Sequence, residues 1–393
     1  MPEHFLHGVE VGTNDIGTRP IRGAKSSVIG LVGTAADAPL GFPRNEPVFL
    51  SGPRAANELG DNGTLKDAYI AAAQNGATEV VVSLAEEGAN AAETQANIAG
   101  DITRGTGVFS LEAARSKLGM VPRILAAPGF TSNLPGSGVN PIVSNLLTVS
   151  DNTAAITLKD GTNTNETDAK ADRQNYGSRR LYIIDPGVTA LDPETATNVA
   201  RPASGYIAGL IAKNDVEKGY WHFPSNTEIR GINGTARPVS WNLTSAATEA
   251  NRMNEAEVST IIRHKGFRLW GNRGTSADAQ WAFMSVVRTD DIVAQSIADA
   301  HLWAMDRPMS AQLVLDIMDG VNAFGQQLVQ RGALLGFECY FDPELNTEET
   351  LKAGKLYLNY RMEPPAPLEH LIFLKERHGA YYDNLVQDIQ RAA

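Results

Sequence analysis

Short β-branched runs alternate with segments of helical period between Ser26 and Trp221. Short apolar runs bounded by Gly, Pro or Asn are typical of buried strands, and apolar residues at helical period are typical of helices that cover a sheet. We therefore predict a layered α/β unit in this part of the chain. Its expected strands lie in SSVIGLVGTA, EPVFL, TEVVVSLAEE, PRILAAPGF and RRLYIIDPGV, and its expected helices over 51–59, 64–74, 109–119 (capped by Ser110, with Gly119 beyond its end) and 201–215.

From Gly231 onward the pattern changes to longer helical segments, which predict a second unit. We expect helices over 255–262, 290–306 and 310–331. Two polar stretches in the first unit, 131–139 and 160–167, are expected to be surface loops because they are rich in turn-forming residues.

Both ends of the chain carry segments that are too short to fold alone. The first 25 residues contain a run at strand period, and near the other end LYLNYRMEP and LEHLIFLKERH are expected to be strands joined by PPAP. The residues that share one face are Phe5, His7, Val9 and Val11 at the first end, and Tyr381, Leu385 and Ile389, at helical spacing, at the second. A lone strand is unstable in water, so such ends either dock on their own chain or complete a sheet in another one.

Length and composition narrow the class of protein. A chain of 393 residues exceeds the usual length of one domain, so two compact units are expected. The apolar fraction of 42% is ordinary for a globular protein, and no segment holds the unbroken apolar run of about 20 residues that a membrane helix needs. The N-terminus lacks the pattern of a signal peptide, so we expect a soluble protein that assembles in the cytoplasm.

Charge and cysteine content exclude further classes. The net charge of −11 argues against binding along nucleic-acid phosphates, which requires a basic surface. The single cysteine, Cys339, rules out an internal disulfide and a multi-cysteine metal cluster. Its surroundings, GFECYF, indicate a buried thiol in a strand rather than a reactive one.

The sequence contains none of the short motifs that mark common active sites, such as G-x-x-x-x-G-K-S/T, G-x-S-x-G or H-E-x-x-H. PGSGVNP is a poor match to a dinucleotide-binding loop, because no clear helix start follows it. His4 and His7 lack the further ligands of a metal site. His264 could be a general base, but no nucleophile is marked nearby and a packed histidine is favoured. We expect no catalytic, cofactor-binding or metal-binding residue.

A polar stripe runs along the helix expected over 310–331. Asp316 and Asp319 lie one turn apart, opposite apolar residues such as Leu315 and Phe324. The further members of the stripe are Gln312, Asn322, Gln326 and Gln330. The stripe is either a solvated face or a contact surface for another protein.

Several phrases, in this order, resemble contractile-tail sheath proteins of the P2-like phage and R-type bacteriocin group. HGVEV and SSVIGLVGTAADA resemble the opening arm and first outer strand of that family, and IIRHKGFRLWGNR (261–273) resembles the start of its main domain. AHLWAMDRPMS (300–310) and LKAGKLYLNYRMEPPAPLEHLIF (351–373) resemble its next helix and its terminal strands. The motif residues in 261–273 are Arg263, Gly266, Trp270, Gly271 and Arg273.

The resemblance implies a two-domain sheath subunit of mixed α/β and α+β structure. It implies an inner domain built from both termini (1–25 and 226–375), an outer α/β domain (26–225) and a C-terminal arm (376–393), with terminal arms that add strands to neighbouring subunits. Such a subunit polymerises around a tail tube and contracts during genome ejection or bactericidal attack. The implied partners are other copies, the tail tube, the baseplate and the tail terminator, without nucleic acid or membrane insertion. The candidate tube contacts are Asp316, Asp319, Gln326 and Gln330.

Two other interpretations stay open at this stage. A sheath of a related contractile secretion system would normally be divided between two chains, whereas this sequence carries both arms and both units. An α/β nucleotide-dependent enzyme is compatible with the layered unit, because a fold does not fix a function.

Overall fold

The computed structural model describes residues 20–133, 136–192 and 195–393. Its largest element is a mostly parallel sheet of eight strands. Its strands are β1 (Ile29–Gly33), β2 (Pro47–Leu50), β3 (Val80–Leu84), β4 (Ile124–Ala126), β5 (Ile156–Asp160), β6 (Leu181–Ile184), β10 (Val258–Arg263) and β11 (Phe267–Trp270). They lie side by side in the order β11-β10-β6-β5-β4-β1-β3-β2. Only the edge strands β2 and β11 run antiparallel to their neighbours within this sheet.

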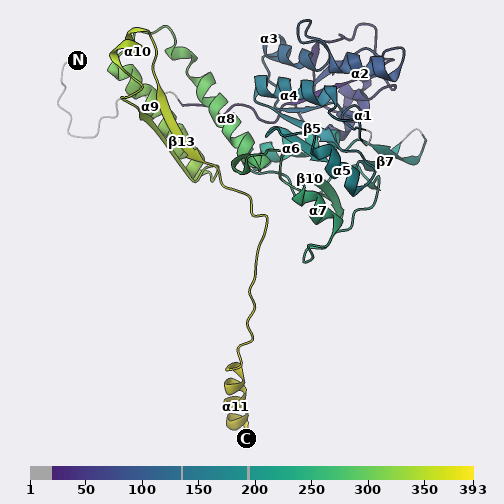
Figure 1. The fold of residues 1–393 in the computed structure, drawn as a ribbon, viewed down its shortest axis with the longest axis vertical. Helices are drawn as coiled ribbons and strands as arrows, with labels where there is room; N and C mark the ends of the chain where they lie inside the picture. Colours follow the sequence, from purple (N-terminus) through teal and green to yellow (C-terminus); the bar gives the residue numbers. More distant parts are fainter. Residues whose placement is uncertain (1–19, 134–135, 193–194) are drawn as a thin grey trace, which may run out of the picture.

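Helices cover both faces of this sheet, as parallel strands require (Figure 1). Consecutive residues of β1 serve the two faces: Leu31 packs with residues of α1 and α6, and Val32 packs with residues of α2 and α4. The helical segments of this unit are η1 (Pro53–Leu59), α1 (Leu65–Gln74), α2 (Ala91–Ala99), η2 (Gly107–Ala113), α3 (Ala114–Leu118), α4 (Pro141–Thr153), α5 (Glu166–Arg173), α6 (Ser204–Glu217), α7 (Glu249–Glu255) and η3 (Ala279–Trp281).

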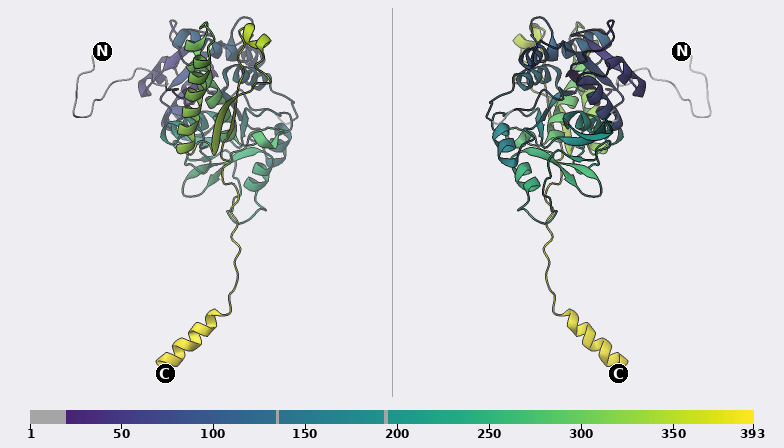
Figure 2. Two further views of the ribbon diagram at one scale, coloured as in Figure 1. Left: turned by 90° about the vertical axis from the view of Figure 1, so that its left-hand side faces the viewer. Right: turned by 90° about the vertical axis from the view of Figure 1, so that its right-hand side faces the viewer.

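Two smaller sheets complete the described fold. A sheet in the order β8-β7-β9, formed by β7 (Val188–Asp192), β8 (Thr197–Arg201) and β9 (Gly234–Thr235), flanks the large sheet. A second unit contains α8 (Met284–Ala300), η4 (Leu302–Ala304), α9 (Ala311–Gln330), α10 (Glu348–Lys352) and a sheet of β12 (Gly336–Phe341) and β13 (Leu358–Glu363). Beyond β13 an extended segment leads to α11 (Tyr381–Ala392), which stands apart from the rest of the molecule (Figure 2).

Buried ion pairs tie α8 to the layered unit. Arg288 Nη1 donates to Asp215 Oδ1 of α6 at 2.6 Å, and Arg288 Nη2 donates to the backbone oxygen of Ser26 at 3.2 Å. One turn further along α8, Asp291 Oδ1 accepts from Arg180 Nη2 at 2.8 Å. Because α8 continues into the second unit, these contacts connect the N-terminal link, the layered unit and the second unit.

The predicted strands of the layered unit are confirmed, but the helix expected over 255–262 is wrong. α7 ends at Glu255, and residues 258–263 form β10, a strand between β6 and β11. Residues 258–262 are buried throughout and rich in β-branched side chains, which favour a central strand. The large sheet therefore runs past residue 225, where we expected the outer domain to end.

Three further local expectations change. Residues 107–113 form a 3₁₀ turn before α3, and Ser110 lies inside it, donating from Oγ to the backbone oxygen of Gly107 at 2.6 Å instead of capping a helix. α8 begins at Met284, earlier than expected, and ends at Ala300. The first three residues of the 160–167 stretch are buried and not on the surface, because β5 continues to Asp160.

Asp160 is buried because its carboxylate joins several segments at the carboxyl end of β5. It accepts from the backbone N–H of Ser204 at 2.8 Å and from Ser204 Oγ at 2.6 Å, at the start of α6. Thr131, at the start of the other expected surface loop, also donates to it at 3.2 Å and is itself buried. Burial raises the pKa of Asp160, and these hydrogen bonds oppose the shift.

Candidate subunit-contact surfaces

The two-stranded sheet of the second unit lies against α9. Phe337 and Cys339 of β12 alternate with exposed residues and join a buried core with Phe324 and Leu328 of α9. The helix approaches the strand closely at Gly325, where an added Cβ would lie 2.0 Å from the ring of Phe337. Burial raises the pKa of the Cys339 thiol, which opposes formation of a reactive thiolate.

Side chains of α9 cover the outer edge of β12. Asn322 Oδ1 accepts from the backbone N–H of Cys339 at 2.7 Å, and Asn322 Nδ2 donates to the backbone oxygen of Cys339 at 3.0 Å. Gln326 Nε2 donates to the backbone oxygen of Phe337 at 3.3 Å. These backbone groups point away from β13, so Phe337 and Cys339 occupy the non-hydrogen-bonded positions of the antiparallel pair.

The opposite edge of this sheet, along β13, is open. The residues opposite Phe337 and Cys339 are Met362 and Tyr360, and the same alternation extends to Leu358. At non-hydrogen-bonded positions both partners direct their backbone groups outward, so these three residues of β13 present N–H and C=O groups to the outside. No backbone partner for them is found among the described residues. This edge can therefore accept another strand.

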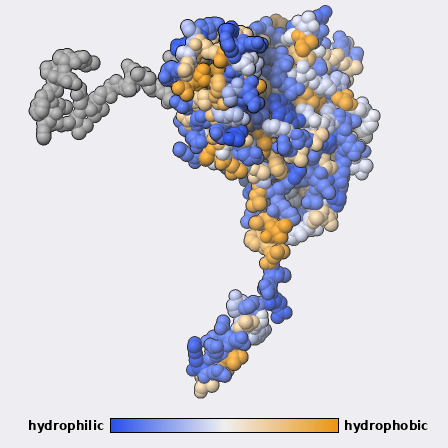
Figure 3. Space-filling view, turned by 60° about the vertical axis from the view of Figure 1, so that its left-hand side comes forward, coloured by the Kyte–Doolittle hydropathy of each residue, from blue (hydrophilic) through white to orange (hydrophobic). Residues whose placement is uncertain are grey.

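The chain leaves β13 as an extended, apolar arm. Residues 364–367, PPAP, favour an extended backbone because proline fixes φ and cannot donate a hydrogen bond. The following side chains Leu371, Ile372, Phe373 and Leu374 are exposed, the last two by 84% and 94%. Figure 3 shows this apolar stretch between the body and the terminal helix. LEHLIFLKERH, which we expected to be a strand, forms none here because no strand of the described chain pairs with it.

α11 is an amphipathic helix without a partner in the described chain. Tyr381, Leu385 and Ile389 lie on one side of it, as their spacing indicates, and all three are exposed. They therefore belong to a helix and not to an arm strand. The counterparts expected in the N-terminal arm, Phe5, His7, Val9 and Val11, lie outside the described residues.

Most of the polar stripe of α9 is exposed, but Asn322 is half-buried and hydrogen-bonded to β12. Asp316, Asp319, Gln326 and Gln330 are all exposed, although the amide of Gln326 is also engaged with β12. Leu315, expected on the apolar side of the helix, is exposed as well. The fully buried residues of α9 begin at Gly320, and the half-buried Ile317 and Met318 also pack against this core, whereas no residue of 311–316 belongs to it.

Four of the five motif residues belong to the β10–β11 hairpin. Gly266 forms its turn with a φ of 102°, which a residue with a side chain rarely adopts, and Arg263 is the exposed last residue of β10. Trp270 packs edge-on against Trp241 with ring centroids 5.5 Å apart. The backbone oxygen of Gly271 accepts from the hydroxyl of Tyr182 at 2.8 Å. These residues have structural roles at the edge of the large sheet.

Arg273, the fifth motif residue, holds the base of the C-terminal arm. Its Nε lies 2.9 and 3.1 Å from the two carboxylate oxygens of Glu369, and its Nη2 lies 2.5 Å from Oε2. Its guanidinium also lies 4.9 Å from the ring centroid of Phe283. The hydrogen bonds to Glu369 raise the pKa of Arg273. This contact, which we call the arm clamp, is made where the arm leaves the body, and both of its side chains are partly exposed.

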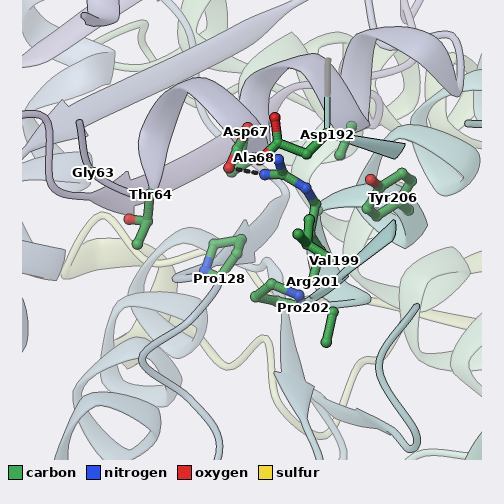
Figure 4. Close-up of a pocket in the computed structure, with 13 residues that line it drawn as sticks. Gly63, Thr64, Asp67, Ala68, Pro128, Asp192, Val199, Arg201, Pro202 and Tyr206 are labelled. Carbon is green, nitrogen blue, oxygen red and sulfur yellow. Dashed lines mark ion pairs between the residues drawn. The ribbon is translucent and has the colours of Figure 1, made fainter. Parts of the chain in front are cut away.

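A pocket of about 300 Å³ lies between α1, α6 and the β7–β8 hairpin (Figure 4). Arg201 and Asp67 form an ion pair across it, and burial raises the pKa of Tyr206 in its wall. Because Arg201 and Asp67 neutralise each other, the pocket offers no unpaired charge from these two residues for catalysis or ligand binding. Across residues 20–133, 136–192 and 195–393, we find no cluster of three metal-ligating side chains, and no helix there is long and apolar enough to span a membrane.

Sequence reasoning missed the closed edge of β12 and the arm clamp. It placed Asn322 only in the polar stripe, since a helix period cannot show which backbone groups a side chain reaches. Glu369 lies 96 positions from Arg273, and no local pattern links two such residues. In the sequence, the one sign of the clamp is that a carboxylate, Glu369, follows the proline-rich segment PPAP.

Two family models match consecutive parts of the chain. The phage tail sheath protein central domain matches residues 109–275, and the phage tail sheath C-terminal domain matches residues 276–376. A prophage major tail sheath protein of Pseudomonas aeruginosa (strain UCBPP-PA14) is 40% identical over 382 residues, covering 95% of this chain and 96% of that protein. The tail sheath protein of Escherichia phage P2 is 36% identical over 396 residues, covering 98% of each.

Solved sheath structures share the fold. The helical sheath of the anti-feeding prophage in its contracted state matches with a TM-score of 0.71 and 17% identity, covering 95% of this chain and 100% of that one. The PVC sheath complex of an extracellular contractile injection system, also contracted, matches with a TM-score of 0.70 and 16% identity over 97% and 100% of the two chains. The mixed α/β fold predicted from the sequence is confirmed, and the chain belongs to the phage tail sheath protein family.

Proposed function

We propose that this chain polymerises as a helical sleeve around a tail tube and contracts to drive the tube through a target cell envelope. The observation that supports the proposal is the C-terminal arm with α11, whose apolar side chains are exposed and cover none of the other described residues. An exposed apolar stretch on an extended segment marks a surface that another protein covers. The relatives named as tail sheath proteins support the same role.

Strand addition between subunits would supply the connection. The open edge of β13 offers two backbone groups on each of Leu358, Tyr360 and Met362. At a net value of about 1 kcal/mol per hydrogen bond, six such bonds contribute roughly 6 kcal/mol before the cost of ordering the arm. Backbone bonds make few demands on side chains, so subunits could stay linked while their other contacts are exchanged.

The two units would divide the work between them. The second unit and both termini would form the inner domain, and the layered unit would form the outer domain. The family match changes at residue 275, and the large sheet includes residues up to Trp270, so we place the division near residue 275 instead of 225. Ile21 packs in the core of the second unit, which supports an inner domain that includes the N-terminal link.

The exposed stripe of α9 is the candidate grip on the tube. Asp316, Asp319, Gln326 and Gln330 would face a complementary patch of the tube protein, while baseplate and terminator proteins would contact the two ends of the sleeve. Exposed charges in such a contact mainly set register and encounter rate, so the subunits could release the tube during contraction.

Contraction would be powered by stored conformational free energy and not by nucleotide hydrolysis. A gain of ~500 Å² of apolar burial per subunit corresponds to about 12 kcal/mol at ~25 cal/mol/Å², before opposing costs. The role is structural, in the tail of a phage or of a DNA-free bactericidal particle that assembles in a bacterial cytoplasm. A subunit with the layered unit and C-terminal arm in one chain favours this role over a secretion sheath divided between two chains.

Electron microscopy of the purified chain and two truncations tests the proposal. The full chain should form hollow tubes or rings, whereas deletion of residues 370–393 or of residues 1–20 should leave a folded protein that forms neither. Circular dichroism and thermal unfolding check that the truncated chains are folded. Normal tubes from both truncations, or a full chain that stays monomeric at every concentration tested, would contradict the proposal.

A further inference from the structure

The turn between β10 and β11 gathers positive charge at one end of the large sheet. Lys265 lies in this turn and is exposed, and Arg268 follows it on β11. An antiparallel bridge between Glu228 and Arg268 aligns the preceding segment with β11, so Arg230 also lies beside the turn. Four side chains of this region, which we call the basic turn, share this place and charge: Arg230, Arg263, Lys265 and Arg268.

No member of the basic turn forms an ion pair with another described residue. Arg268 instead donates to the backbone oxygens of His264 at 2.9 Å and Asn226 at 2.7 Å. Glu228 brings one carboxylate close, since its Oε1 lies 2.4 Å from where a Cβ on Gly266 would stand. Positive charge therefore remains in excess at this turn, in a chain whose net charge is −11.

The opposite end of the sheet carries negative charge. Glu86 and Glu87 lie just beyond β3 and are exposed, and Glu93 is exposed in the first turn of α2. Arg44 approaches Glu86 at 3.8 Å, whereas Glu87 and Glu93 form no ion pair within the part of the chain that the structure describes. We call these three glutamates the acidic end. It complements the basic turn in charge.

Both charged regions lie along the same edge of the sheet. β3 and β10 belong to its parallel set, and segments beyond the carboxyl ends of parallel strands leave from one edge. The strands β6, β5, β4 and β1 separate β10 from β3, which corresponds to about 24 Å at ~4.8 Å per strand. At that distance the two regions of one copy do not reach each other. Two copies placed side by side in the same orientation bring the basic turn of one to the acidic end of the next.

We propose that the basic turn of one copy contacts the acidic end of a second copy, so that layered units join head to tail. Because the two surfaces differ, each copy offers one on either side, and such heterologous contacts close into rings or continue as helices. The inference rests on the proposed assembly into a sheath and adds a contact between layered units to it. A second copy is favoured over nucleic acid, because the rest of this acidic chain would repel a phosphate backbone, whereas another copy offers carboxylates at a fixed place.

Charge reversal at each end is the first test. Purified chains are brought to increasing concentration, and sedimentation with electron microscopy gives the lowest concentration at which tubes form. Arg230→Glu with Lys265→Glu, and separately Glu86→Lys with Glu87→Lys, should each raise this concentration about tenfold, because opposite charges become like charges. The first pair of substitutions leaves the hydrogen bonds of Arg268 in place.

A matched control changes the same amount of charge elsewhere. Lys218→Glu with Lys355→Glu serves for this, because both lysines are exposed and neither forms an ion pair with a described residue. This control should shift the concentration by less than about twofold. Circular dichroism and thermal unfolding check that every variant is folded, as substitutions at exposed positions allow.

Mixing the two reversed chains tests whether the contact joins different copies. Alone, each reversed chain would bring like charges together at every contact. In an equal mixture, the reversed turn of one chain meets the reversed end of the other, and the two unchanged surfaces also meet. The mixture should therefore form tubes within about twofold of the concentration that the unaltered chain requires.

Several results would overturn the inference. These are tubes from both reversed chains at the unaltered concentration, an equal shift in the control, or a mixture that assembles no better than its parts. Loss of duplex-DNA binding by Arg230→Glu with Lys265→Glu in a gel-shift assay, without a change in assembly, would instead identify a polyanion as the partner. An unaltered chain that forms no tubes would refute the sheath proposal and this inference with it.

Discussion

Replacing Asp215 with Ala should strongly destabilise the chain at the joint between its two units. The side chains of Arg288 and Asp215 are only 3% and 1% exposed, and they meet through two parallel contacts. Removing the carboxylate leaves the guanidinium buried with only the backbone oxygen of Ser26 as a described partner. Breaking a buried ion pair from one side typically costs about 3–5 kcal/mol, whereas an exposed pair is worth roughly 0–1 kcal/mol.

Urea unfolding of the purified full chain at low concentration measures this cost. Lys352→Ala is the matched control, because its ion pair with Glu348 is 74% and 80% exposed and its loss should change the free energy of unfolding by less than about 0.5 kcal/mol. The double variant Arg288→Met with Asp215→Leu should recover much of the loss, since it leaves no buried charge unpaired.

The same experiment can refute the reasoning. A loss below about 1 kcal/mol for Asp215→Ala would show that water or a rearranged side chain reaches Arg288, so that the pair is not buried as described. Limited proteolysis adds a local readout, because weaker anchoring of α8 should expose the segment before Met284 to faster cleavage. Unchanged cleavage alongside a large stability loss would mean that the damage spreads beyond the joint.

Three further predictions concern the ion pair of Glu166, the charges of Asp316 and Asp319 on α9, and the energy source of contraction. The hydrogen bond from Arg252 lowers the pKa of Glu166 from 4.5 to about 2, so the ionised carboxylate stabilises the folded chain. The free energy of unfolding lost in Glu166→Gln should therefore be constant above about pH 4.5 and vanish as the pH falls toward 2, where the carboxylate is protonated. Urea unfolding at several pH values measures this loss. Reversing the charges of Asp316 and Asp319 should lower the yield of tube-filled sheaths without impairing self-assembly, as microscopy would show; normal yields would exclude this contact. Calorimetry of extended particles should show an exothermic, irreversible transition in nucleotide-free buffer, and a requirement for ATP would contradict the proposed energy source.

Much of the layered unit could be predicted from sequence because its strands and helices repeat a simple pattern, but β5 and α4 were not among the expected elements. Buried parallel strands such as β3 are short apolar runs, and each is followed by a turn signal. The same rule failed at β10, where Glu255 and the apolar residues after it imitate a helix period. A strand that is buried on both faces shows no alternation of apolar and polar residues. Its sequence alone therefore does not distinguish a strand from a helix, and only its pairing with β6 and β11 identifies β10 as a strand.

The contact surfaces were predictable only in part. Unpartnered segments at the chain end can be seen in the sequence, because LEHLIFL is too apolar and too short to be stable alone. Which edge of a sheet is open depends on side chains from other elements. Asn322 of α9, for example, closes the edge of β12. Such contacts join residues across a fold, and a single sequence without its three-dimensional arrangement does not reveal them.

An open sheet edge such as that of β13 is a hazard for any protein in solution. Any exposed strand can pair with the wrong chain, and natural proteins limit this risk by short edges, by charges or by covering elements. Two of these devices are present here: Arg361 and Glu363 lie on the exposed face of β13, and α9 covers the edge of β12. Arg273 binds Glu369 at the start of the apolar arm, so the arm leaves the body beside the layered unit and not along β13. If the chain assembles as we propose, the specificity of polymerisation would depend as much on the edge of β12 that α9 closes as on the edge of β13 that is open.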